Sequence, residues 1–325
     1  MQVTSVEKKQ NFLYRLNNSY YKPEIFAGVG LIILSIILSF ASPYFLTRNN
    51  LINLVRQISL YAIIASGMTF VILTGGIDLS VGSIVAVTGT FTAGFMKAGT
   101  PVWLSILIGF GMALLFGLFN GFVISNPRIP AIIVTLSSMS IGRGAALLYS
   151  NGYPISGLPS SFTSFGRGYW GPIPIPVYVM VAIFIITYII ITNTRFGRYV
   201  YALGGSEETV RLSGIAVKKI KTMVYVISAF MAGISGLLLA SRLGSGQPLA
   251  GDGWELDAIA AVVVGGTDIA GGRGTIIGTI IGSFIIGVLN NGLNLLNVSP
   301  YLQLVVKGFV IVSAVLVRAG VVKHK

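Results

Sequence analysis

The sequence predicts an all-α, polytopic membrane protein, and three observations support this fold class. Of the 325 residues, 54% are hydrophobic and only 10% are charged, and the mean hydropathy is +0.85. A soluble domain carries about 25% charged residues, so a soluble fold of this size would lack the charges to cover its surface. The second observation is that apolar runs such as 25–41 and 177–192 contain no charge and suit helices that cross a hydrocarbon core. The third is the uneven distribution of lysine and arginine between the segments that join such runs.

We expect ten membrane-spanning helices in a single transmembrane domain, residues 1–325. The eighth apolar stretch is too short to cross as one regular helix. It therefore either begins earlier, taking in Glu255 and Asp257, or is broken. The expected spans are 25–42, 55–73, 81–97, 102–124, 129–149, 175–193, 222–241, 255–265, 275–297 and 301–318.

The positive charges predict that both termini are cytoplasmic. Lysine and arginine are enriched in cytoplasmic segments of membrane proteins. With the N-terminus inside, the cytoplasmic segments hold Lys8, Lys9, Arg15, Lys22, Arg128, Arg195, Arg198, Arg211, Lys218, Lys219, Lys221, Arg273, Arg318, Lys323 and Lys325. The opposite side holds fewer, namely Arg48, Arg56, Lys97, Arg143, Arg167 and Arg242. The net charge of +13 therefore indicates orientation in a lipid bilayer, and no nucleic-acid partner is expected.

Three connecting segments stand out from the apolar background. Residues 150–174 and 242–254 are rich in Gly, Pro and Ser, which favours external loops or re-entrant segments rather than helices. Residues 194–221 form the longest cytoplasmic loop. Within it, Ser206 can cap a short helix that ends at Gly214. Such a helix is a rigid docking element, although an ordinary basic loop lying on anionic lipid is an alternative.

One short motif occurs twice. LTGGIDLSVG (73–82) and VGGTDIAGGRG (264–274) each place an Asp two residues after a Gly-Gly pair, at the end of an apolar run. An even number of spans separates them, so both are expected on the cytoplasmic side. The glycines allow tight reversals. Asp78 is expected to cap the following helix, either through Ser80 or through its own carboxylate, and Asp268 is expected to play the same part before the ninth span. The alternative is an inner gate or a rim around a partner. The residues concerned are Gly75, Gly76, Asp78, Gly265, Gly266 and Asp268.

Small residues recur at the spacing that brings helices together in lipid. Gly274, Gly278 and Gly282 are four residues apart, and Gly117 and Gly121 repeat this spacing. We expect close helix packing at these positions. The dinucleotide-binding spacing G-x-G-x-x-G is not met, since Gly278 follows Gly274 too late.

The sequence lacks the groups that membrane enzymes need. Its only histidine is His324 and it has no cysteine, so we expect no catalytic residues and no metal site. No G-x-x-x-x-G-K-[ST] phosphate loop is present, so the chain has no recognisable means of hydrolysing ATP. Asp257 is the best candidate for a buried acid and Lys307 for a buried base. Because most other acids lie in loops, ion coupling within the chain looks weak and energy is expected from another polypeptide.

Four stretches resemble the membrane subunits of bacterial sugar-importing ABC transporters. ALGGSEETVRLSGI (202–215) resembles their coupling segment. ILTGGIDLSVGS (72–83), ELDAIAAVVVGGTDIAGGRGTIIGTIIG (255–282) and VLNNGLNLLNVSPYLQLVVKG (288–308) resemble other signature stretches of the family. The similarity covers almost the whole chain and is greatest to the ribose permeases. It implies a helical fold of about ten spans, similar to the vitamin B12 importer class.

The resemblance also implies partners. These are a second permease copy, an ATPase subunit with two nucleotide-binding modules that hold ATP and Mg, and an extracytoplasmic sugar-binding protein. The chain itself is expected to hold no cofactor and to reside in a bacterial cytoplasmic membrane. The residues expected to contact the ATPase are Ala202, Leu203, Gly204, Glu207, Arg211, Leu212, Ser213 and Gly214. A mild departure is Gly205-Ser206, where many members have Gly-Asn; both Ser and Asn cap helices.

A sugar needs modest hydrogen-bonding partners along its path. Asn290, Asn294 and Asn297 are spaced four and three residues apart, so they are expected to share a helical face that lines the outer part of the path. Polar packing between helices is an equal alternative. Two rival functions remain at this point: a self-sufficient secondary sugar transporter or facilitator, and a membrane receptor or scaffold.

Overall fold

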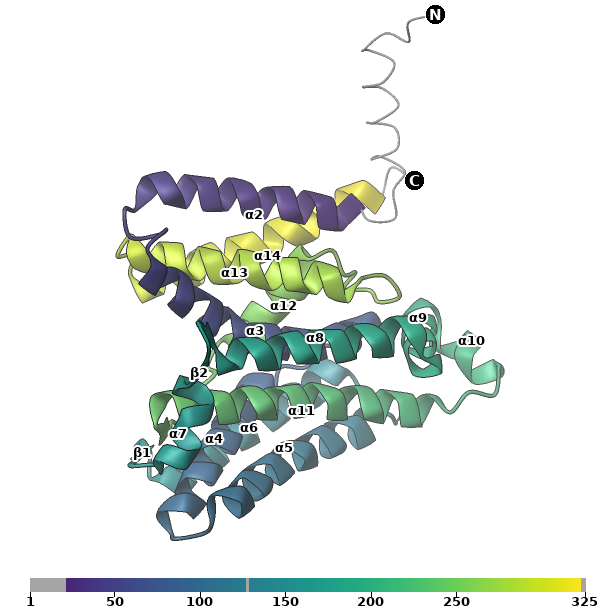
Figure 1. Cartoon of the computed structure of the whole chain (residues 1–325). Coiled ribbons are helices and arrows are strands. Elements are labelled where there is room, and N and C mark those ends of the chain that lie inside the picture. The colour runs from purple at the N-terminus through teal and green to yellow at the C-terminus, as the bar shows by residue number, and fades with distance from the viewer. Residues whose placement is uncertain (1–21, 127–128, 323–325) are drawn as a thin grey trace, which may run out of the picture.

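The computed structural model describes residues 22–126 and 129–322, and helices dominate it (Figure 1). Two small antiparallel sheets pair β1 (Ile155–Ser156) with β4 (Ser245–Gly246), and β2 (Tyr169–Trp170) with β3 (Ile173–Pro174). The helices are α2 (Lys22–Ala41), α3 (Arg48–Leu73), α4 (Val81–Lys97), α5 (Val102–Ile124), α6 (Ala131–Ser150), α7 (Ser160–Arg167), α8 (Ile175–Asn193), α9 (Arg195–Gly205), α10 (Glu207–Leu212), α11 (Val217–Leu243), α12 (Trp254–Val264), α13 (Ile276–Leu295) and α14 (Pro300–Val322).

Seven of the described helices are long and apolar enough to cross a membrane: α2, α3, α5, α6, α8, α11 and α13. The predicted class, an all-α polytopic membrane protein, is therefore confirmed. Each of the ten predicted spans coincides with a helix, although α4, α12 and α14 are not among the seven. Six basic residues used to predict orientation lie outside the described residues: Lys8, Lys9, Arg15, Arg128, Lys323 and Lys325.

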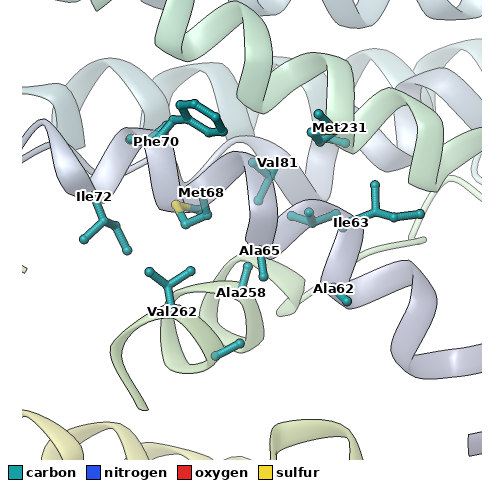
Figure 2. Packing of buried hydrophobic residues seen from close by; sticks show 14 of the residues in the cluster. Ala62, Ile63, Ala65, Met68, Phe70, Ile72, Val81, Met231, Ala258 and Val262 are labelled. Atoms are coloured by element: carbon teal, nitrogen blue, oxygen red, sulfur yellow. The ribbon is translucent and has the colours of Figure 1, made fainter. Parts of the chain in front are cut away.

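Helix α4 is enclosed by the rest of the bundle. Its side chains are buried along almost the whole of Val81–Lys97, and it packs against α5, α6 and α11. Helix α3 is likewise buried from Ile58 to Leu73. Figure 2 shows Met68 of α3 beside Ala258 and Val262 of α12. A helix that is apolar on all sides belongs in the middle of a bundle, where other helices rather than lipid surround it.

The connecting segments hold more helix than the sequence predicted. Segment 150–174, predicted to be external, contains α7, and segment 194–221, predicted to be cytoplasmic, contains α9 in addition to the expected short helix. The side chain of Thr194 accepts a hydrogen bond from the backbone N–H of Gly197 and so caps the start of α9. Arg143, predicted on the external side, lies within α6.

The predicted close packing is confirmed at Gly117, Gly121, Gly278 and Gly282, whereas Gly274 lies in the loop before α13 and meets the side chain of Thr267. A Cβ atom at Gly282 of α13 would lie 1.8 Å from the carbonyl oxygen of Ala261 in α12, and one at Gly278 would lie 2.0 Å from that of Gly265. In α5, a Cβ atom at Gly121 would lie 2.6 Å from the Cα atom of Thr222. Without side chains at these points, the backbones of neighbouring helices approach each other closely, as helix association in lipid requires.

Replacing Gly282 by alanine is expected to destabilise the protein by about 1–3 kcal/mol, because the new methyl group meets backbone that must move. Thermal unfolding of the purified protein in detergent measures this change. Gly111→Ala in α5 is the matched control, since a Cβ atom there meets nothing within 4 Å. The control should leave the unfolding temperature unchanged or raise it. Equal unfolding temperatures for G282A and the control would contradict the close-packing argument.

The eighth predicted span both begins earlier than its apolar run and is broken, so it combines the two alternatives that the sequence left open. Helix α12 begins at Trp254, so Glu255 and Asp257 lie in its first turn, but it has only 11 residues. At 1.5 Å per residue it is about 16 Å long, roughly half a bilayer core. It is preceded by a non-helical stretch, residues 244–253, which we call the re-entrant segment. Glycines with positive φ lie at both its ends, Gly244 at 70° and Gly253 at 76°.

Candidate functional site

The two Gly-Gly-x-Asp motifs, almost 200 residues apart in the chain, meet in the structure. The backbone N–H of Gly272 donates to the carbonyl oxygen of Leu73 over 2.9 Å. Gly75 lies so close to the second motif that a Cβ atom would be 3.3 Å from the carbonyl oxygen of Ala270. We call this contact the glycine junction, made by residues 73–76 and 270–274. It joins the end of α3 to the loop that precedes α13.

The expected tight reversals are confirmed at one glycine of each pair. Gly75 has φ +75° and Gly266 has φ +98°, a region that residues with side chains rarely adopt. The other two glycines serve close approach instead. At Gly76, a Cβ atom would lie 2.5 Å from the hydroxyl oxygen of Tyr225. At Gly265, it would lie 2.2 Å from the carbonyl oxygen of Gly278.

Helix α9 completes the glycine junction. At Gly204 a Cβ atom would lie 2.0 Å from the carbonyl oxygen of Leu73 and 2.1 Å from the backbone nitrogen of Gly272, so only glycine fits there. Tyr201 of the same helix donates its hydroxyl to the carbonyl oxygen of Gly274 over 2.7 Å. The first part of the predicted coupling segment therefore rests directly on both repeated motifs.

Helix α10 has the start and the end that the sequence predicted. Ser206 is its N-cap, and its hydroxyl oxygen accepts a hydrogen bond from the backbone N–H of Thr209 over 3.2 Å. Glu207 and Glu208 lie in the first turn, where negative charge is stabilised by the helix dipole. Gly214 follows with φ +77°, which ends the helix.

The residues predicted to contact an ATPase divide into two groups. Leu203 is buried and Gly204 packs on the glycine junction, so these two face inward. The others are exposed: Ala202, Glu207, Arg211, Leu212, Ser213 and Gly214. Leu212 is 76% exposed, a large apolar side chain displayed on a short polar helix.

The exposed charges of α10 are paired within the segment. Arg211 Nη2 lies 2.6 Å from Glu208 Oε1, and Lys221 pairs with Glu207. The hydrogen bond from Arg211 lowers the pKa of Glu208. Both partners of the Arg211–Glu208 pair are open to solvent, so the pair orders the helix surface rather than stabilising the fold.

Asp78 lies at the centre of a buried polar network that joins four helices. Its Oδ1 atom accepts hydrogen bonds from the backbone N–H and the hydroxyl of Ser80, over 3.0 and 2.6 Å. Its Oδ2 atom accepts from the hydroxyl of Ser228 in α11 over 2.7 Å. Asn120 of α5 donates to the Ser80 hydroxyl over 2.9 Å and accepts from Ser138 of α6. The network thus ties α4 to α5, α6 and α11.

The predicted capping roles of the two aspartates need correction. Ser80 is at the N-cap position of α4 but makes no side-chain capping bond, and Asp78 binds Ser80 rather than the first turn. Helix α13 is capped by Thr275, whose hydroxyl accepts from the backbone N–H of Gly278 over 3.0 Å. Asp268 instead accepts from the backbone N–H of Ala270 within the loop, over 3.1 Å.

Asp257 and Lys307, the predicted candidates for a buried acid and a buried base, form an ion pair. Lys307 of α14 lies 2.9 Å from Oδ1 of Asp257 in α12, and Asp257 is only 3% exposed. Asn290 of α13 donates to Asp257 Oδ2 over 3.5 Å. The cluster therefore connects three helices. Among the residues that the structure describes, no group of three His, Cys, Asp or Glu side chains is placed to hold a metal ion.

The three asparagines do not form a continuous face. Asn290 is buried against Asp257, and Asn294 accepts from Gln303 over 2.9 Å. Helix α13 ends at Leu295, and Asn297 follows it with φ +53°, so the expectation that Asn297 shares a helical face with Asn290 and Asn294 was wrong. Sequence reasoning also missed Asn291, which exchanges two hydrogen bonds with Asn50 of α3.

Seven long apolar helices among the described residues define a multi-pass membrane protein. The chain belongs to the family described as branched-chain amino acid transport system / permease component, whose profile matches residues 50–315. It is 49% identical over 290 residues to the ribose import permease protein RbsC of Bacillus subtilis (strain 168), covering 89% of this chain and 90% of that protein. It is 46% identical over 296 residues to RbsC of Escherichia coli (strain K12), covering 89% and 91%.

A more distant relative is the L-arabinose transport system permease protein AraH of Escherichia coli (strain K12). It is 38% identical to the chain over 274 residues, covering 84% of each protein. No solved structure matches the chain significantly.

Proposed function

We propose that this chain carries ribose across the cytoplasmic membrane of a bacterium. It is the permease subunit of a sugar-importing ABC transporter, and a separate subunit hydrolyses ATP. The observation that carries the choice of ribose is the 46–49% identity to ribose import permeases over nine-tenths of the chain. The identity to an arabinose permease is lower, at 38%.

The proposed assembly has two permease copies, an ATPase with two nucleotide-binding modules and an extracytoplasmic ribose-binding protein. Each permease copy contributes ten spans, has both termini in the cytoplasm and resembles the vitamin B12 importer class. The binding protein docks on segment 150–174 and on the outer end of segment 242–254. ATP and Mg are held by the ATPase, and this chain holds no cofactor.

The proposed route of coupling begins at α10. The ATPase contacts Ala202, Glu207, Arg211, Leu212, Ser213 and Gly214, while Leu203 and Gly204 transmit the movement inward. Support comes from the position of Gly204, whose backbone contacts both halves of the glycine junction. Because α3 and the loop before α13 meet there, a displacement of α9 reaches both. The junction, with Gly75, Gly76, Asp78, Gly265, Gly266 and Asp268 around it, is the proposed inner gate.

The rival secondary transporter would need an ionisable group that exchanges ions during transport. The most buried acid found in a helix, Asp257, already has Lys307 as its counter-charge. The similarity to ABC permeases argues for an external energy source.

Reconstitution tests this function directly. Proteoliposomes that contain the chain with an ATPase subunit, a ribose-binding protein, internal ATP and external labelled ribose should accumulate the sugar. The chain alone should accumulate none. Uphill ribose uptake by the chain alone would overturn the proposal, as would an assembled complex that transports another sugar and no ribose.

Leu212→Asp is expected to weaken ATPase binding by about thirtyfold, because an apolar anchor at the centre of an interface contributes about 2 kcal/mol or more. The fold should tolerate the change, since Leu212 is 76% exposed. Co-purification with the ATPase measures it. Tyr153→Asp, at a 75% exposed tyrosine in segment 150–174, is the control and should retain the ATPase. Equal retention by both variants would remove Leu212 from the interface.

A further inference from the structure

The re-entrant segment carries polar groups to the middle of the membrane. Helix α12, about 16 Å long, ends near the glycine junction, so its first residue lies roughly half a bilayer away from that side. Arg143 is twelve residues into α6, about 18 Å from the start of that helix. The start of α6 is also near the junction side, since Thr135 donates to the carbonyl oxygen of Ile77 over 3.3 Å. The first residue of α12 and Arg143 of α6 therefore lie at about the same depth in the membrane.

The re-entrant segment descends along α4 to reach this depth. A Cβ atom at Gly246 would lie 2.6 Å from the carbonyl oxygen of Gly89. At Gly251, further along, it would lie 2.6 Å from the carbonyl oxygen of Gly82, close to the first residue of α4. The two glycines thus let a non-helical backbone lie against the buried helix α4.

Arg143 satisfies backbone groups that the re-entrant segment leaves without helical partners. Its Nη1 atom donates to the carbonyl oxygens of Pro248 and Ala250 over 2.9 and 2.8 Å. Inside a membrane, irregular backbone is tolerated only where it is buried in protein or lines a water-filled cavity. Arg143 is mostly covered, with 17% of its side chain exposed, and it holds the segment against α6.

Asp252 distinguishes between these two settings. Its carboxylate is 3.8 Å from Arg143 Nη2, yet 82% of its side chain is exposed. A carboxylate that faced lipid at this depth would be strongly unfavourable, by about 2.5 kcal/mol or more. The exposed face beside Asp252 therefore requires water rather than hydrocarbon.

We propose that Asp252, held at the end of the re-entrant segment by Arg143, lines the water-filled path through which the sugar crosses. This inference rests on the proposed function and names a position on the path that the sequence did not predict. The carboxylate accepts hydrogen bonds from sugar hydroxyl groups. The arginine beside it keeps the local charge near neutral, which suits an uncharged polyol that must be released again.

The absence of cysteine from the chain makes a direct test possible. Asp252→Cys in the assembled importer is placed in nanodiscs, where both faces are open, and treated with a membrane-impermeant, positively charged thiosulfonate. Ile185→Cys is the control, since Ile185 is 55% exposed in the middle of the apolar helix α8. The D252C thiol should react at least tenfold faster than the I185C thiol, because only an ionised, hydrated thiol reacts.

Ribose uptake completes the test. Labelled D252C complex, reconstituted into proteoliposomes, should transport at least tenfold less ribose than the unlabelled variant. Loss of uptake in unlabelled, fully assembled D252C also supports the proposal, because the carboxylate lies outside the packed core. Equal reaction rates for the two thiols would overturn it, and so would normal ribose uptake by labelled D252C. Failure of the proposed function is distinguishable, since the unaltered complex would then transport no ribose whatever the thiol rates.

Discussion

Lys307→Met is expected to destabilise the protein by about 3–5 kcal/mol, the cost of leaving a buried charge without its partner. Asp257 is 3% exposed, and its carboxylate lies 2.9 Å from the ammonium group that this substitution removes. The remaining donor, Asn290, is 3.5 Å away and uncharged. Thermal unfolding in detergent and the yield of monodisperse protein measure the effect.

The double variant Asp257→Asn with Lys307→Met is the control for this prediction. It removes both charges, so the buried site becomes neutral and most of the lost stability should return. Lys307→Arg should retain at least part of the pairing. If K307M unfolded at the same temperature as the unaltered protein, the pair would not hold α14 to α12, and this view of the cluster would have to be given up.

Asp78→Ala is expected to destabilise the protein by a similar amount. The carboxylate is fully buried and accepts three hydrogen bonds, two from Ser80 and one from Ser228. Alanine leaves these donors without an acceptor, and each unsatisfied buried donor costs about 1–3 kcal/mol. The variant should therefore lose transport because the subunit unfolds or fails to assemble. Membrane abundance and thermal unfolding, measured beside ribose uptake, separate this cause from a direct effect on transport.

Asp78→Asn is the matched variant, since its amide oxygen still accepts from Ser80 and the Ser228 hydroxyl can turn to accept from the amide nitrogen. It should be markedly more stable than D78A. A D78A protein that is normally abundant and assembled yet inactive would assign Asp78 to the transport cycle itself.

The sequence was sufficient to predict the helical membrane fold and the position of most spans, because the length of each apolar run can be counted in the sequence. It was also sufficient for α10, since the N-cap Ser206 and the terminal Gly214 act locally. Helix α9 was missed because its sequence, RFGRYVYALGG, contains glycines and charges that resemble a loop. Its stability comes from packing on the glycine junction, which is a tertiary contact.

The two aspartates show why a repeated motif does not imply a repeated role. Asp78 is three residues before α4, near enough to bind Ser80 at the N-cap position. Asp268 is eight residues before α13, so Thr275 takes the capping position there. The pairing of Asp257 with Lys307 and the depth of Arg143 depend on how helices distant in the sequence pack, and no local pattern encodes them.

The backbone contacts of Gly204 have a consequence for the timing of transport. Side chains between two elements can rotate and so absorb a small shift of one of them. At Gly204 no side chain intervenes, because the backbone of α9 touches Leu73 and Gly272 directly. A tilt of α9 is therefore expected to move the end of α3 and the loop before α13 together. Intermediates in which only one half has responded should be too short-lived to accumulate.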